Sequence, residues 1–171
     1  MRKRPASVPL GGLRDDKKAE TGAFGALRRE PDERLEGAGE GGRVAIGFRA
    51  SRSHRIVDMK ECHVLRPELV ALVGPLRRLL AGRRERWAGD VDLTLADQGA
   101  DCALRGVALD GLEATEAALE FARANGLARL SVDFGYGAEP IWEPQPTTVT
   151  LGGTPVGLPT GAFLQATADG E

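Results

Sequence analysis

Residues 91–107 read VDLTLADQGADCALRGV, and this stretch decides the fold class. Its first half alternates apolar and polar side chains, which is the two-residue period of a half-buried strand. Asp97-Gln98-Gly99 then supplies the residue types that favour a tight turn, before a second apolar segment over residues 102–107. The stretch therefore predicts an antiparallel β-hairpin.

C-terminal to this hairpin, the sequence indicates a helix followed by further strands. Asp110 and Glu113 have the spacing of a capping box, and Asn125-Gly126 is typical of a helix end. Leu112, Leu119 and several alanines are expected on its buried face. Beyond it, a strand is predicted at residues 130–134 and a second hairpin over residues 148–158, across Gly152-Gly153.

N-terminal to the central hairpin, Val44, Ile46 and Phe48 predict a strand, and residues 56–59 predict its partner. A helix follows from Pro67, with Leu69, Leu72, Val73, Leu76 and Leu80 on one face. Gly74-Pro75 removes a backbone hydrogen bond from this helix, so we expect a kink near Ala71 and an end near Gly82.

Successive hairpins indicate an α+β fold with a mainly antiparallel sheet and the two amphipathic helices packed on one face. Residues 1–42 mix charge with glycine without a sustained period, which predicts a poorly ordered N-terminal segment. Residues 133–137 (DFGYG) superficially suggest a cofactor-binding glycine turn. The prolines that follow exclude a helix there. We therefore expect residues 133–137 to form a loop, and we do not expect a doubly wound fold.

Composition limits the possible functions. The chain has 171 residues and a net charge of -2, so any contact with nucleic acid must come from a local basic patch. No apolar run approaches the roughly 18 residues of a membrane helix, which predicts a cytoplasmic protein. The two cysteines, Cys62 and Cys102, are too few for a disulfide framework.

Two stretches resemble one enzyme family. Residues 44–65 (VAIGFRASRSHRIVDMKECHVL) and residues 159–171 (PTGAFLQATADGE) resemble segments of the S-adenosylmethionine-dependent RNA (uracil-5-)-methyltransferases. The resemblance implies that residues 43–160 form the central, RNA-facing domain of such an enzyme. Residues 161–171 would begin the linker to a methyl-donor domain that this sequence lacks, as in a damaged or partial gene.

The resemblance also implies roles for individual residues. In the family, a glutamine at the position of Gln165 contacts S-adenosylmethionine. Cys62 falls where some members supply one ligand of a 4Fe-4S cluster, but a half-buried inert thiol is the simpler interpretation, and a cluster is not expected here because the other ligands are missing. The family nucleophile and base belong to the absent domain, so no catalytic residue is assigned and the chain is expected to be inactive alone.

Arg49, Arg52, His54 and Arg55 lie between the two predicted N-terminal strands. They are candidates for contacts with RNA phosphates, in ribosomal or transfer RNA; a solvated basic loop is the alternative. A second basic run, which includes Arg77, suits the end of the kinked helix.

Three interpretations remain open. The chain is part of an RNA uracil methyltransferase whose catalytic domain is either lost or on a separate chain, and it has neither DNA nor membrane as a partner. It is a stand-alone RNA-binding or protein-interaction module. Or it is a small structural domain whose sheet edges recruit a partner chain.

Overall fold

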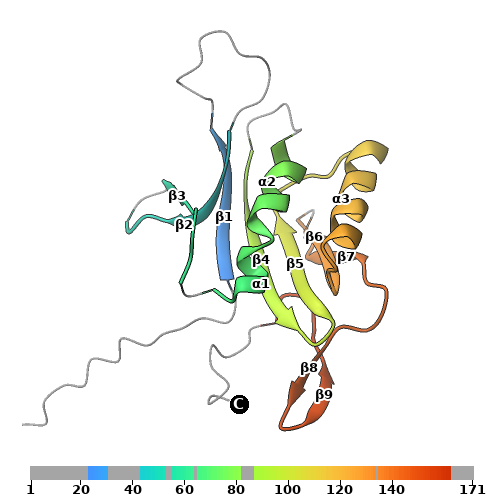
Figure 1. Cartoon of the computed structure of the whole chain (residues 1–171). Helices are drawn as coiled ribbons and strands as arrows, with labels where there is room; N and C mark the ends of the chain where they lie inside the picture. Colours follow the sequence, from blue (N-terminus) through green and yellow to red (C-terminus); the bar gives the residue numbers. More distant parts are fainter. Residues whose placement is uncertain are drawn as a thin grey trace, which may run out of the picture.

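A twisted β-sheet forms the centre of the molecule (Figure 1). The computed structural model describes residues 23–30, 43–52, 55–63, 65–81, 87–133 and 135–162, with only the backbone for residues 23–30 and 43. Within these residues the sheet has seven strands: β1 (Ala23–Glu30), β2 (Arg43–Arg49), β3 (Ile56–Asp58), β4 (Ala88–Ala96), β5 (Gly99–Arg105), β6 (Arg129–Asp133) and β7 (Ala138–Trp142).

The strand order across the sheet is β3-β2-β1-β4-β5-β6-β7. Neighbouring strands are antiparallel except β5 and β6, which are parallel because helix α3 (Leu112–Ala124) connects them. The predicted α+β fold with a mainly antiparallel sheet is confirmed, and so is the β4–β5 hairpin.

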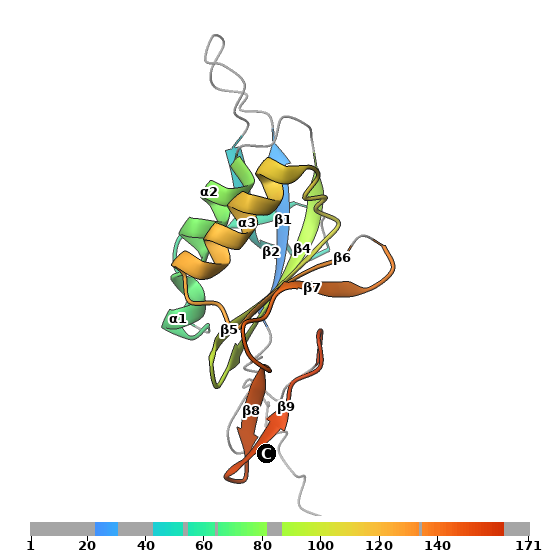
Figure 2. The same ribbon diagram turned by 90° about the vertical axis from the view of Figure 1, so that its right-hand side faces the viewer.

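The helices cover one face of the sheet, as predicted (Figure 2). The helix that begins at Pro67 is broken into α1 (Pro67–Val70) and α2 (Val73–Ala81). Pro75 has no N–H to donate to the carbonyl of Ala71, so the chain turns there before the hydrogen bond from Leu76 N to Leu72 O, 2.9 Å long, resumes the helix. The expected kink is therefore confirmed.

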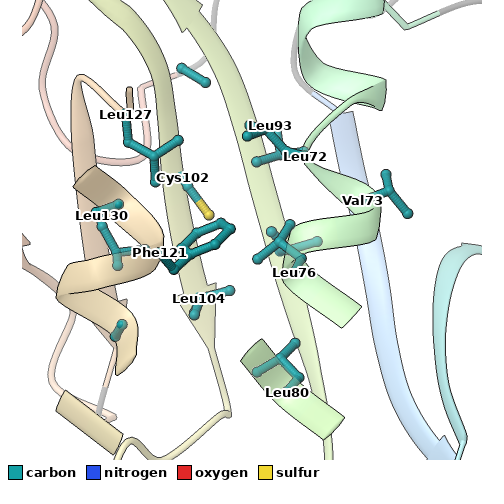
Figure 3. Packing of buried hydrophobic residues seen from close by; sticks show 14 of the residues in the cluster. Leu72, Val73, Leu76, Leu80, Leu93, Cys102, Leu104, Phe121, Leu127 and Leu130 are labelled. Carbon is teal, nitrogen blue, oxygen red and sulfur yellow. The ribbon is translucent and has the colours of Figure 1, made fainter. Parts of the chain in front are cut away.

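The main core lies between these helices and the sheet. Figure 3 shows Leu76 of α2, Phe121 of α3 and Cys102 of β5 turned toward the same interior space. Leu76 and Leu80 are fully buried. Complete burial of a leucine side chain stabilises a fold by about 1.5–3 kcal/mol, so truncating either to alanine would cost about 2–5 kcal/mol once the cavity is included.

The start of α3 differs from the prediction. Gly111, with φ 85°, occupies the N-cap position, and no side chain caps the helix, so the capping box that Asp110 was expected to open is wrong. Leu112 is 75 % exposed, so it does not belong to the buried face of the helix. The buried face uses Ala118, Phe121 and Ala122 instead.

Two strands were not predicted from the sequence. β1 lies inside the segment 1–42 that was expected to be poorly ordered, and it pairs with β2 on one side and β4 on the other. The remainder of that segment lies outside the described residues. β7 contains Pro140, which is compatible with a strand at the edge of the described sheet because an outward-facing N–H is not needed there.

A second, two-stranded sheet joins β8 (Thr148–Leu151) and β9 (Thr154–Gly157), as predicted. Both turn glycines have positive φ, 55° for Gly152 and 81° for Gly153, which fits the tight turn of a two-residue hairpin loop. Asp97, in the β4–β5 turn, accepts hydrogen bonds from Thr148 Oγ1 at 2.7 Å and Thr150 N at 3.1 Å. These bonds anchor the small hairpin to the end of the main sheet.

Candidate nucleic-acid interface

The β2–β3 hairpin carries the candidate RNA-binding arginines. Its turn is closed by a 2.8 Å hydrogen bond from Ala50 N to Arg55 O. At Gly47, a Cβ atom would lie 1.9 Å from the carbonyl oxygen of Val57, so this close approach of the two strands requires glycine. The close packing of the two hairpin strands therefore accounts for the glycine at position 47.

Arg77 of α2 fastens the hairpin to the rest of the fold. Its guanidinium donates to Asp58 Oδ1 at 2.5 Å and to Met59 O at 2.6 Å. Asp58 Oδ1 also accepts a hydrogen bond from Ile46 N at 3.2 Å, so one carboxylate joins β2, β3 and α2. The sequence suggested only a helix-end charge for Arg77; its partners could not be found without the fold.

The structure brings three of the predicted residues, Arg49, Arg52 and Arg55, to one hairpin, and all three are exposed. Arg49 forms an ion pair with Asp90 of β4 at 3.3 Å, which offsets part of its charge. Arg52 has φ 54°, a left-handed conformation that is unfavourable for a residue with a Cβ atom. The fourth candidate, His54, lies outside the described residues.

The two cysteines are free thiols in different surroundings. Cys62 is half-buried, and its sulfur accepts a hydrogen bond from Leu65 N at 3.4 Å. Cys102 is fully buried, and that burial, followed by the charges of Asp101 and Asp92, raises the pKa of its thiol well above the usual range. The described part of the chain contains no group of three metal-binding side chains. A 4Fe-4S cluster, which needs four such ligands, does not fit these residues.

A buried ion pair fixes the segment that follows β9. Arg129 donates from Nε to Asp101 Oδ1 at 3.0 Å and from its terminal nitrogen to Oδ2 at 2.6 Å. The other terminal nitrogen donates to Leu158 O at 2.9 Å. This pair was not predicted, because Asp101 and Arg129 become neighbours only through the parallel β5–β6 register.

Comparison with known proteins identifies the family. No family model matches the chain. It is 45% identical over 136 residues to an uncharacterized RNA methyltransferase of Zymomonas mobilis and 35% identical over 130 residues to one of Brucella melitensis. It is also 42% identical over 89 residues to the 23S rRNA (uracil(1939)-C(5))-methyltransferase of Yersinia enterocolitica. The chain belongs to the RNA (uracil-5-)-methyltransferase family.

The matches cover 77%, 75% and 50% of this methyltransferase-family chain, respectively. The chain spans only 33%, 30% and 20% of the length of those relatives. The family assignment therefore rests on a shared part of larger proteins.

Of two further sequence motifs in this family member, one is described by the structure and the other is not. Residues 133–137 join β6 to β7, and Asp133 Oδ1 accepts hydrogen bonds from Gly135 N and Gly137 N at 2.7 and 3.1 Å, so the predicted loop is confirmed at its described residues. Gln165, the residue aligned by resemblance with a cofactor contact, lies outside the described residues. Among those that are described, no helix is long and apolar enough to cross a membrane.

Proposed function

We propose that this chain is the RNA-binding part of an enzyme that transfers a methyl group from S-adenosylmethionine to carbon 5 of uridine in ribosomal RNA, in the cytoplasm. The observation that carries this proposal is the similarity to relatives named for that reaction on 23S rRNA. Transfer RNA is the alternative substrate. The exposed arginines of the β2–β3 hairpin support a role in RNA contact.

We assign no catalytic residue to the chain. The resemblance implies a cysteine nucleophile, but the Cys102 thiol is enclosed by the core and has a raised pKa, so it has no path to a substrate. S-adenosylmethionine supplies the methyl group when bound, and Gln165 is the proposed contact, since its amide offers both a donor and an acceptor.

A calorimetric titration of S-adenosylmethionine tests the Gln165 assignment. Saturable binding that is lost in Gln165→Ala would support it. Equal binding by the variant would contradict it. No binding by the unmodified chain would show that these residues do not hold the cofactor by themselves.

Arg52 is the arginine whose contact with RNA we expect to contribute most, because Arg49 already pairs with Asp90. Each phosphate contact to single-stranded RNA contributes about 0.7 to the slope of log affinity against log salt. We expect Arg52→Gln to weaken binding of a 23S rRNA segment and reduce this slope by about 0.7, measured by fluorescence anisotropy.

Arg123→Gln provides the matched control, because Arg123 is exposed on α3, at the opposite side of the molecule from the hairpin (Figure 1). If Arg52→Gln and Arg123→Gln had equal effects, binding would reflect general charge and the hairpin would not be the interface.

A stand-alone RNA-binding module would show the same hairpin effects. Methyl incorporation separates the two functions: labelled S-adenosylmethionine is supplied with 23S rRNA to the chain combined with the remaining portion of the Zymomonas relative. Methylation of uridine that depends on this chain supports the enzyme; RNA binding without any transfer supports the module.

A further inference from the structure

The β2–β3 hairpin has an exposed apolar pair beside its basic turn. Phe48 is 43% exposed and Val57 is 52% exposed. They are directly opposite each other in the antiparallel register, so their side chains lie on the same face. Val44 and Ile46, which share that face of β2, are buried in the main core. Phe48 therefore continues the apolar face of β2 beyond the part that the core covers.

The turn next to this pair is basic. The next turn contains Arg52, which is exposed and has φ 54°. A left-handed conformation at a residue other than glycine, asparagine or aspartate is uncommon and is often found at binding sites. Between residues 49 and 60 the only acidic residue is Asp58, and Arg77 pairs with it at 2.5 Å.

We propose that Phe48, beside Val57, is a platform on which one unpaired base of the RNA stacks, while Arg52 neutralises an adjacent phosphate. The inference rests on the proposed RNA-binding function and adds a preference for single-stranded RNA. An aromatic ring can stack on any base, because every base has a π face, and a cation beside it attracts the backbone. A paired base in a duplex cannot reach such a ring without leaving its own stack.

A protein partner is the competing occupant, because an exposed apolar pair near an edge strand also suits a protein contact. The arginines in the turn beside Phe48 favour RNA, which is a polyanion, over a protein partner. The test below separates the two.

The experiment measures the affinity of the chain for a short single-stranded RNA and for the matching duplex, by fluorescence anisotropy. The single strand also carries 2-aminopurine, whose fluorescence falls when it stacks on an aromatic ring. Phe48→Leu keeps an apolar side chain and removes the ring. We expect it to weaken single-strand binding about five-fold or more, to abolish the quenching and to leave duplex binding unchanged.

Two variants serve as controls. Tyr136→Leu removes another exposed ring, 99% exposed in the β6–β7 loop, and should change nothing. Phe48→Trp should retain or strengthen single-strand binding. If substitutions at position 48 weakened binding only by misfolding the hairpin, this variant would lose binding as well.

If Phe48→Leu left single-strand affinity and quenching unchanged while Arg52→Gln still weakened binding, the stacking inference would be overturned and the proposed RNA function would stand. Self-association that Phe48→Leu abolishes, with RNA affinity unchanged, would identify a protein contact and also overturn it. An unmodified chain that binds neither RNA would contradict both proposals.

Discussion

Arg129→Met is expected to destabilise the fold strongly. The Arg129 and Asp101 side chains are only 4% and 7% exposed, and their two hydrogen bonds measure 3.0 and 2.6 Å. Asp101 also raises the pKa of Arg129, so the arginine is charged at any pH at which the protein is folded. Removing the guanidinium leaves a buried carboxylate without its counter-charge and the Leu158 carbonyl without its donor.

Breaking a buried pair by removal of one partner costs about 3–5 kcal/mol, because the remaining charge is uncompensated. The double variant Asp101→Leu with Arg129→Met leaves no buried charge, so we expect it to recover a large part of that loss. Arg123→Met breaks only the exposed pair between Arg123 and Glu120 and should cost no more than about 0.5 kcal/mol.

Urea unfolding followed by tryptophan fluorescence measures these free energies by linear extrapolation. Trp142 is a suitable probe because its Nε1 donates to Leu127 O at 3.1 Å, close in sequence to Arg129. A loss below about 1 kcal/mol for Arg129→Met would refute the reasoning, since it would mean that Asp101 is solvated in the folded protein.

Three further predictions follow from single contacts. Gly47→Ala should destabilise the protein by about 1–3 kcal/mol in urea unfolding because its Cβ would overlap the Val57 carbonyl, whereas Gly74→Ala, with ordinary contacts inside α2, should stabilise it by about 0.5–1 kcal/mol. Asp97→Ala should accelerate amide hydrogen exchange in β8 and β9 while exchange in β4 and β5 stays slow; equal acceleration in both sheets would contradict the anchoring role. Burial raises the pKa of Asp92 above its usual 3.8, so the folded state binds the proton more tightly than the unfolded state, and wild-type stability falls as pH rises from about 3.8 through the folded-state pKa. Asp92→Asn should therefore gain stability relative to wild type as pH rises above about 4, and a difference that stays constant with pH would contradict it.

The sequence predicted those elements whose cause is local. The β4–β5 hairpin follows from its alternating pattern and turn residues, and the helix break follows from Pro75. The parallel pairing of β5 with β6 was beyond this reasoning, as was β1, which is a strand because it has partners on both sides. The capping box predicted at Asp110 was wrong for the same reason, because a motif of four residues does not show where the helix packs on the core.

For the candidate site, the sequence located the basic turn but not the electrostatic state of its arginines. Arg49 and its partner Asp90 are 41 residues apart, and only the order β2-β1-β4 brings them together. The exposure of Phe48 was equally hidden, because its place in the alternating pattern predicts a core residue. What separates it from Ile46 is how far the core extends along the face of β2.

The same pairings explain how a chain of net charge -2 can present a cationic surface. Four aspartates of the main sheet form ion pairs with arginines, in the pairs Arg77–Asp58, Arg49–Asp90, Arg105–Asp92 and Arg129–Asp101. Paired charges produce little field at a distance, whereas the exposed Arg52 is close to the solvent that an RNA would enter. Net charge is a sum over the whole molecule, but a phosphate responds to the charges within about a Debye length. The proposed RNA binding at this hairpin should therefore depend on one or two local contacts, and its salt dependence should be shallow compared with that of a protein covered in positive charge.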